Sequence, residues 1–260
     1  MPSIDDSKCV LVTGATSGIG RALALAIAAL PSKPVVIAAG RRKERLEELK
    51  KAGLETIEVN VDSDNETLKR FADEVVEKYP DLDTVIYGAG VQHELEFHKG
   101  IDIKNVASEI NINYTSIVTL VSHFMPHFFR ISEQGRPTFI ITVTSGLAVT
   151  PAPWIFNYCA SKAALHSFTI SLRIQLQDKN IHVTEIMPPL VESELHDTYG
   201  TTERLSKFWM PLDEYTKTTM EGLRRGDKHI TCGAVLDTYK RFEEGKDEFA
   251  AKALIARSKW

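Results

Sequence analysis

This chain of 260 residues has few cysteines, no long apolar run and no large excess of charge of either sign. Its 31 basic and 35 acidic residues give a net charge of −4, so no global field would gather nucleic acid or an anionic membrane. The longest alanine- and leucine-rich stretch, 22–30, has nine residues, whereas a helix that spans a bilayer needs about 20. We therefore expect neither nucleic acid nor a membrane as a partner.

The three cysteines, Cys9, Cys159 and Cys232, are odd in number and lie far apart in the sequence. Zinc and redox sites usually show closely spaced pairs, so this pattern predicts no metal site and favours a reducing compartment. We accordingly expect a cytoplasmic protein. The 43% of apolar residues can fill a substantial core, and the length suits one large α/β domain.

Short apolar runs alternate along the chain with longer segments of helical period. This alternation predicts a doubly wound Rossmann fold, in which a parallel sheet of about seven strands carries helices on both faces and makes a three-layer sandwich. The six βα units are too few for an eight-stranded barrel. The expected strands are 9–13, 34–39, 55–61, 84–87, 138–144, 182–187 and 228–232, and the expected helices are 19–30, 42–52, 65–78, 104–129, 157–177 and 213–225.

The alternation loosens after residue 187, where Pro188-Pro189 interrupts it. We expect a single Rossmann-type domain over 1–260 with three parts. Residues 1–187 would hold the cofactor-binding core and the catalytic residues, 188–227 a substrate loop and helix, and 228–260 a C-terminal strand and tail.

A glycine-rich turn, Thr-Gly-Ala-Thr-Ser-Gly-Ile-Gly over 13–20, directly follows the first expected strand and opens the first expected helix. Such a turn brings backbone N–H groups and the positive end of the helix to a pyrophosphate. An ordinary tight turn is the alternative, but the strand before it and the alanine-rich helix after it favour a dinucleotide site. The residues expected to hold the cofactor here are Gly14, Ser17, Gly18, Ile19 and Gly20.

The end of the second expected strand indicates which dinucleotide binds. NAD sites usually place a carboxylate there to hold the ribose hydroxyls, whereas NADP needs cations for its 2′-phosphate. Here Arg41 and Arg42 follow the strand, and no carboxylate occupies its end. A solvated basic helix start is the alternative, but the position of the two arginines favours NADP(H).

A proton-transfer group is suggested by Tyr158 and Lys162, four residues apart on an expected helix, and by Ser145 at the end of the fifth expected strand. Positions i and i+4 share a helix face, so Lys162 can lie beneath the tyrosine ring. A cation at about 4 Å is worth about 4 kcal/mol at an effective dielectric of about 20. We expect Lys162 to lower the pKa of Tyr158 and Ser145 to hold a substrate carbonyl beside the phenol.

These motifs closely resemble those of the short-chain dehydrogenase/reductase family over residues 8–193. In that family a Thr-Gly-x-x-x-Gly-x-Gly loop binds the cofactor, and the resemblance assigns catalysis to Asn113, Ser145, Tyr158 and Lys162. It also implies cofactor contacts from residues that follow the third, fourth and sixth strands and from the catalytic pair. These residues are Asp62, Ala89, Gly90, Tyr158, Lys162, Val191 and Ser193.

Three departures from the family pattern stand out. The Asn-Asn-Ala-Gly after the fourth strand is Tyr-Gly-Ala-Gly over 87–90, so other contacts must brace the central sheet. The usual Pro-Gly after the sixth strand is Pro188-Pro189, as in an oxidoreductase branch of the family, and Ser193 replaces a threonine. The aspartate expected to meet adenine is either Asp62 or has been replaced by Asn60.

The resemblance and the motifs together predict an NADPH-dependent enzyme that reduces a ketone or aldehyde to an alcohol. Leu147 and Trp154, with Ser145 and Tyr158, would contact the small-molecule substrate, which the aromatic residues suggest is apolar. The alternative is a catalytically silent NADP(H)-binding sensor or scaffold with the same fold. By analogy with the family, the long helices over 104–129 and 157–177 would form a homodimer or homotetramer.

Overall fold

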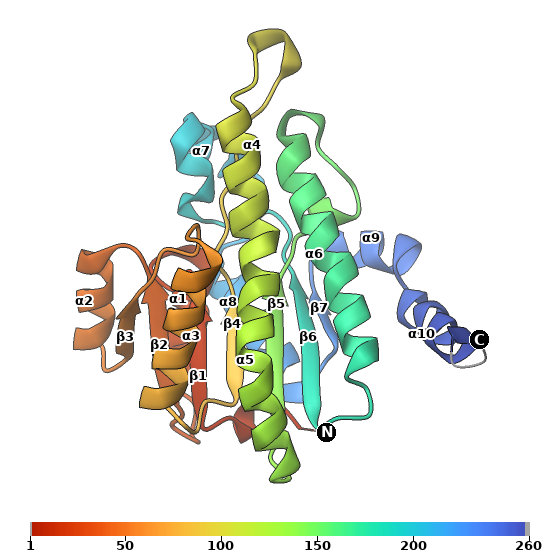
Figure 1. Ribbon diagram of the computed structural model, residues 1–260. Helices are drawn as coiled ribbons and strands as arrows, with labels where there is room; N and C mark the ends of the chain where they lie inside the picture. Colours follow the sequence, from red (N-terminus) through yellow and green to blue (C-terminus); the bar gives the residue numbers. More distant parts are fainter. Residues whose placement is uncertain (1, 258–260) are drawn as a thin grey trace.

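The computed structural model describes residues 2–257, so residues 1 and 258–260 of the expected domain lie outside it. One seven-stranded sheet forms the centre of the molecule, with every pairing parallel and the strands in the order β3-β2-β1-β4-β5-β6-β7 (Figure 1). The predicted Rossmann sheet is confirmed. The strands are β1 (Cys9–Thr13), β2 (Val35–Gly40), β3 (Glu55–Glu58), β4 (Thr84–Tyr87), β5 (Thr138–Val143), β6 (Ile181–Met187) and β7 (His229–Thr231).

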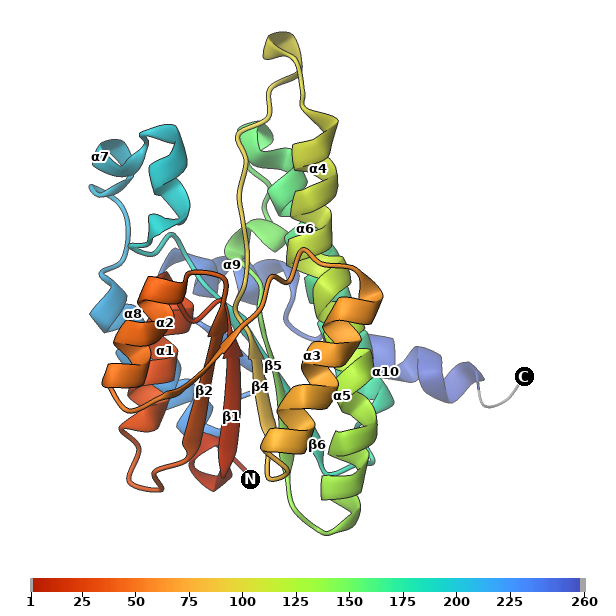
Figure 2. The same ribbon diagram turned by 60° about the vertical axis from the view of Figure 1, so that its left-hand side comes forward.

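Helices cover both faces of the sheet and complete the three layers (Figures 1 and 2). Successive strand side chains point to opposite faces, so Cys9 and Leu11 join one core while Val10 and Val12 join the other. Helices α3, α5 and α6 close the first core, and α1 and α8 close the second. The helices of these layers are α1 (Gly18–Ala28), α2 (Lys43–Lys51), α3 (Asn65–Lys78), α5 (Ser116–Glu133), α6 (Phe156–Gln175) and α8 (Leu212–Arg225).

Three expected elements differ in the structure. The helix expected over 104–129 begins as α4 (Ile103–Ile110), passes through a π turn at Asn111–Thr115 and continues as α5. Strand β3 ends at Glu58 rather than at residue 61, so Asp62 lies in the following loop. The expected C-terminal tail contains two helices, α9 (Ala234–Phe242) and α10 (Lys246–Arg257).

Two short elements follow the carboxyl end of β6. The expected substrate loop holds a 3₁₀ turn, η6 (Glu194–Tyr199), and the short helix α7 (Thr202–Leu205). The segment between β4 and α4 rises above the sheet at the top of Figure 1. Among the described residues no helix is long and apolar enough to span a bilayer.

A buried network of charged side chains attaches the C-terminal helices to the core. Glu185 of β6 is fully buried and accepts hydrogen bonds from Nδ1 of His166 at 2.8 Å and Nδ1 of His229 at 3.1 Å. On their other nitrogens, His166 meets Glu243 at 2.8 Å and His229 meets Asp247 at 3.1 Å. Helix α6, strands β6 and β7, and the last two helices are thereby joined through one cluster.

This network predicts that the protein loses stability as the pH rises above neutrality. Burial acts to lower the pKa values of His166 and His229, but the carboxylates around them prevail and raise both. A histidine whose pKa is higher in the folded than in the unfolded protein stabilises the fold while it is protonated. This stabilisation is complete below the unfolded-state pKa of about 6.5 and is lost as the pH rises through the folded-state pKa. The free energy of unfolding in urea should therefore fall as the pH rises above about 6.5. The His166→Gln variant should show a shallower fall, and an equal slope in both proteins would contradict this account.

Candidate active site

The glycine-rich turn between β1 and α1 has the shape of a phosphate cradle. Gly14 and Gly18 have φ values of 70° and 49°, a region that side chains rarely adopt. A Cβ atom on Gly20 would lie 2.5 Å from the Gly14 carbonyl oxygen, so only glycine fits where the helix begins. The turn leaves the first N–H groups of α1 facing outward beyond the sheet, and these residues fit the pyrophosphate of a dinucleotide.

The turn after β4 packs directly against this cradle. A Cβ atom on Gly14 would lie 2.7 Å from the Ala89 backbone, and one on Gly88 would lie 2.9 Å from the Thr13 carbonyl oxygen. Close packing between the backbones of the two turns therefore takes the place of the asparagine contacts expected from the family pattern. Tyr87 lies in the sheet with its hydroxyl buried and without a hydrogen-bond partner among the described residues.

Ser145 and Tyr158 meet just beyond β5. Ser145 follows the strand, and its Oγ accepts a hydrogen bond from the Leu147 N–H at 3.1 Å. Tyr158 lies in the first turn of α6, and the Ser145 side chain lies close enough to its hydroxyl to act on the pKa of the phenol. Both side chains are more than nine-tenths buried, so a substrate that reaches them leaves bulk water.

Lys162 lies one turn further along α6, as the spacing predicts. Its Nζ is 5.7 Å from the centre of the Tyr158 ring and donates a hydrogen bond to the Val143 carbonyl oxygen at 2.8 Å. A Cβ atom on Gly90 would lie 3.5 Å from this Nζ, so the turn after β4 also borders the amine. Glycine at that position keeps the space beside Lys162 open.

The expectation that Lys162 lowers the pKa of Tyr158 is not met by this arrangement. Burial raises the pKa of Tyr158, and the nearby Ser145 side chain opposes that rise without cancelling it. Burial also lowers the pKa of Lys162 to about 8, because a dry environment disfavours the ammonium form. The phenol is consequently held protonated at neutral pH, the form that can give a proton.

Asn113 lies in the π turn that the helical period did not predict. Its Nδ2 donates to the Val91 carbonyl oxygen at 2.9 Å and to Ser161 Oγ at 3.0 Å, while its Oδ1 accepts from the Val91 N–H at 2.9 Å. The side chain thus joins the turn after β4 to α6, beside the tyrosine and the lysine. Single π turns inside α-helices occur frequently at functional sites.

Glu109, one turn before Asn113, is a site residue that the sequence reasoning missed. Its carboxylate is fully buried and accepts from Asn157 Nδ2 at 2.5 Å and from the His93 N–H at 2.8 Å. Burial raises the pKa of Glu109, while those two donors and the charge of Lys162 act to lower it. In the sequence, the four-residue spacing places Glu109 on the same helix face as Asn113. Glutamates at this spacing also occur on solvent-exposed helices, so the spacing did not single out Glu109.

The two arginines after β2 lie in different surroundings. Arg41 is exposed at the end of the strand, whereas Arg42 turns toward the cradle and donates to Ser17 Oγ at 2.5 Å. Asp62 is engaged elsewhere, because its carboxylate accepts from Ser108 Oγ and Asn111 Nδ2, both at 2.7 Å. A contact between Asp62 and adenine stays a proposal. In such a contact, adenine would share the Asp62 carboxylate with Ser108 and Asn111.

The segment after β6 borders the cradle and the tyrosine. A Cβ atom on Gly18 would lie 3.3 Å from Ser193 Cβ, so this segment crosses the cradle. Val191 has its side chain in the second core, which leaves its backbone for any cofactor contact. Leu147 packs against the buried cluster that contains Tyr158, and Trp154 is half-exposed beside that region.

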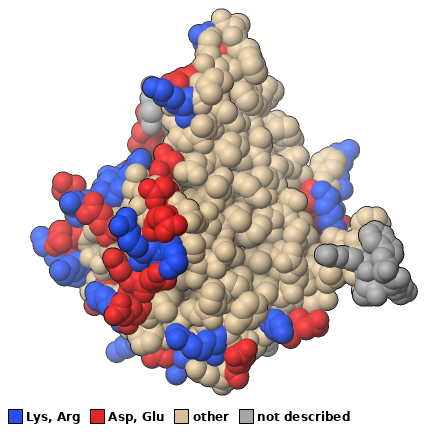
Figure 3. Space-filling model, in the orientation of Figure 1, with Lys and Arg blue, Asp and Glu red and all other residues tan. Residues whose placement is uncertain are grey.

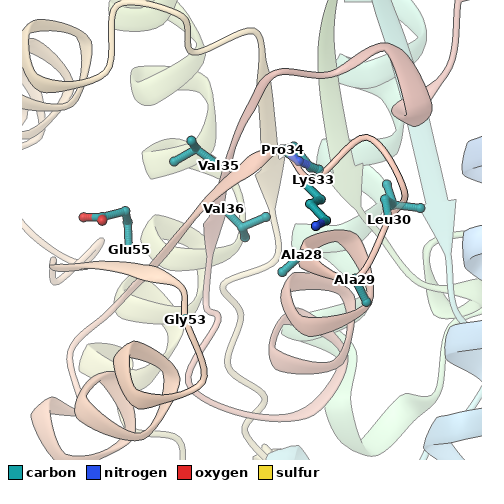
Figure 4. A pocket seen from close by; sticks show the side chains of 9 residues that line it. All are labelled: Ala28, Ala29, Leu30, Lys33, Pro34, Val35, Val36, Gly53 and Glu55. Atoms are coloured by element: carbon teal, nitrogen blue, oxygen red, sulfur yellow. The ribbon is translucent and has the colours of Figure 1, made fainter.

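A separate hollow lies at the opposite end of β2 and is unrelated to this site. It is lined by the end of α1, the connection into β2 and the residues before β3 (Figure 4). Since β2 begins there, the hollow is at the amino end of the sheet, away from the glycine turn. Ligands of open α/β sheets bind beyond the carboxyl ends of the strands.

The parallel sheet, the glycine cradle and the Ser-Tyr-Lys arrangement define a Rossmann-fold dehydrogenase as the class of protein. The chain belongs to the short chain dehydrogenase family, whose sequence pattern matches residues 8–204. It is therefore a member of an oxidoreductase family.

Three similar proteins illustrate the range of this resemblance. An uncharacterized oxidoreductase, DltE, from Bacillus subtilis is 35% identical over 228 residues, which cover 86% of this chain and 88% of that protein. A short-chain dehydrogenase from Sphingobium yanoikuyae solved in complex with NADPH superposes with a TM-score of 0.78 at 21% identity and covers 95% of both chains. One from Burkholderia phymatum in complex with NAD gives a TM-score of 0.78 at 21% identity, with 92% of this chain and 94% of that chain covered.

Proposed function

We propose that this protein is an NADP(H)-dependent oxidoreductase that reduces a ketone or aldehyde carbonyl to an alcohol. The proposal rests on the position of Ser145 and Tyr158, whose side chains lie near each other in a buried site beside the glycine cradle. A carbonyl oxygen placed against both hydroxyls would accept two hydrogen bonds as negative charge develops on it. Such donors, fixed in advance, stabilise a forming oxyanion.

In this mechanism the chain supplies orientation and a proton, and the bound nicotinamide supplies the hydride. Ser145 orients the carbonyl, and Tyr158 gives its proton to the oxygen. With its pKa raised by burial, Tyr158 is protonated at neutral pH, which is the form that the reductive direction requires. Lys162 would hold the nicotinamide ribose, and Asn113 would support the path that returns a proton to the phenol.

The proposed cofactor site follows the carboxyl ends of the strands. Its pyrophosphate would lie on the cradle, its 2′-phosphate beside Arg41 and Arg42, and its nicotinamide near Tyr158. The NADPH and NAD complexes of similar fold support a dinucleotide in this place without choosing between the two. The further proposed contacts are Gly14, Ser17, Gly18, Ile19, Gly20, Asp62, Ala89, Gly90, Lys162, Val191 and Ser193.

The choice of NADP(H) can be tested at Arg41, which forms no ion pair among residues 2–257. A charge-assisted hydrogen bond contributes about 1.5–3 kcal/mol, so Arg41→Ala should weaken NADPH binding by about 10- to 100-fold. The affinity for NADH should stay within about twofold. Fluorescence titration measures both constants, and Lys43→Ala, which removes an exposed neighbouring cation, is the matched control. Equal losses for the two nucleotides would reject the assignment.

The reaction itself is tested by following NADPH consumption with a panel of ketones, diketones and aldehydes. Leu147 and Trp154 would border the substrate, and the apolar cluster around Tyr158 favours apolar carbonyls. Turnover on any of them supports the proposal. Tight NADPH binding with no turnover across the panel would favour the silent sensor.

We also propose that the protein is a homodimer or homotetramer in the cytoplasm. The face formed by α5 and α6 carries almost no charge over a wide area (Figure 3). A groove on it is lined by apolar residues of both helices, among them Val121, Met125, Phe129 and Phe168. All three cysteines are free, which suits a reducing compartment.

A further inference from the structure

Glu194, in the segment that follows β6, binds two arginines at the edge of the glycine cradle. One carboxylate oxygen accepts from Arg42 Nη1 at 2.7 Å, and the other accepts from Arg45 Nη1 at 2.6 Å. Burial acts to raise the pKa of Glu194, but the two arginines prevail and lower it, so the group is a carboxylate at neutral pH. The sequence pattern gave no sign of this contact, because about 150 residues separate the partners.

The same arginines are fixed to the cradle on their other side. Arg42 donates from Nη2 to Ser17 Oγ at 2.5 Å and from Nε to Thr16 Oγ1 at 3.1 Å. Arg45 donates to the Thr16 carbonyl oxygen at 3.3 Å. The carboxylate therefore lies beside the end of β2 and the glycine turn, on a guanidinium that the proposed function assigns to the 2′-phosphate of NADP(H).

A carboxylate and a phosphate cannot both use these donors without cost. Arg42 already directs one N–H from each of its three nitrogens to Glu194, Ser17 and Thr16, so a phosphate bound to this guanidinium would share Nη1 with Glu194 or Nη2 with Ser17. Two anions drawn to one guanidinium also repel each other over a few ångströms. Glu194 is the acceptor held from a loop rather than from the cradle itself.

The residues on either side of Glu194 connect this contact to the rest of the site. Ser193 lies against Gly18 of the cradle. Leu195 packs against the buried cluster that contains Tyr158. Three consecutive residues thus meet the phosphate cradle, the arginines and the proposed proton donor.

We infer that Glu194 is a specificity residue that competes with the 2′-phosphate for Arg42 and Arg45, and that its displacement repositions residues 193–195 beside Tyr158. The inference rests on the proposed function, in which Arg42 meets the 2′-phosphate of NADP(H). It predicts that the loop responds to a nucleotide that carries a 2′-phosphate and does not respond to one that lacks it.

The test uses 2′,5′-ADP and 5′-AMP as probes, because they differ only in the 2′-phosphate and require no turnover. Calorimetry on the full chain should show that Glu194→Gln binds 2′,5′-ADP about three- to tenfold more tightly than the original protein, as expected for releasing two partly exposed ion pairs. Binding of 5′-AMP should be unchanged. The matched control is Glu192→Gln, which removes an exposed charge two residues away and keeps an acceptor for the Leu212 N–H.

The outcomes separate this inference from the proposed function. If the original protein prefers 2′,5′-ADP but Glu194→Gln binds it equally or more weakly, Glu194 does not compete and only the inference is overturned. If neither protein prefers 2′,5′-ADP, the NADP(H) assignment is overturned together with it. Hydrogen exchange gives a second readout: 2′,5′-ADP should speed exchange of the 193–197 amides in the original protein, and no change there would overturn the coupled displacement.

Discussion

The Tyr158→Phe variant should lose at least about 100-fold in kcat for carbonyl reduction while its affinity for NADPH stays within about twofold. The change removes one hydroxyl from a side chain that is more than nine-tenths buried and lies near Ser145. General acid catalysis by a positioned side chain contributes about 10²- to 10⁴-fold, and the phenylalanine ring retains the packing. Stopped-flow or steady-state absorbance of NADPH measures kcat, and fluorescence titration measures the binding.

Tyr215→Phe is the matched control for this result. Tyr215 lies in α8, buried in the core on the other face of the sheet, and its loss of a hydroxyl should leave kcat unchanged. Turnover by Tyr158→Phe within about fivefold of the original protein would show that Tyr158 is not the proton donor. Loss of NADPH binding in step with kcat would instead indicate a structural role.

The second large effect is expected at Glu185, the centre of the buried network. Glu185→Leu should lower the free energy of unfolding by about 3–5 kcal/mol, the cost of removing one partner from a buried set of charges. The fully buried carboxylate accepts from His166, His229 and Thr144, and its pKa is lowered to about 2 by the two histidines, which outweigh the effect of burial. Leucine would leave three donors without their acceptor in a dry site.

Urea unfolding at neutral pH measures this loss, with Glu244→Leu as the control. Glu244 is an exposed glutamate that follows α9, so its replacement should change the free energy of unfolding by less than about 0.5 kcal/mol. A loss below about 1 kcal/mol for Glu185→Leu would mean that the histidines find other partners. Retention of the C-terminal helices in limited proteolysis would argue against their attachment through this network.

The network also lies close to the active site. Thr144, which donates to Glu185 at 2.7 Å, directly precedes Ser145. Val235 of α9 packs so closely on Gly146 that a Cβ atom there would lie 2.4 Å from Val235 Cγ2. The C-terminal helices thus support the turn that presents Ser145, a role that the expected tail did not include.

The sequence by itself determined the features that depend on local spacing. Alternating apolar runs predicted the parallel sheet, and β1, β4 and α3 begin and end at the predicted residues. The spacing of Tyr158 and Lys162 put both on one face of α6, because positions i and i+4 of a helix are neighbours. The glycine turn was predicted from the spacing of its glycines between an apolar strand and an alanine-rich helix. The positive φ values of Gly14 and Gly18 and the close contact at Gly20 are the physical reason for that spacing.

Only the tertiary structure decided what depends on burial and on partners far apart in the chain. The pKa of Tyr158 rises rather than falls because burial exceeds any help from Lys162, and burial cannot be read from spacing. In the sequence, Glu109, Glu185 and Glu194 cannot be told from solvent-exposed glutamates, because their partners come from distant segments that only the fold brings to them. The ion pair of Glu194 with Arg42 exists because parallel strands bring their carboxyl ends to one edge of the sheet, which places the segment after β6 beside the segment after β2.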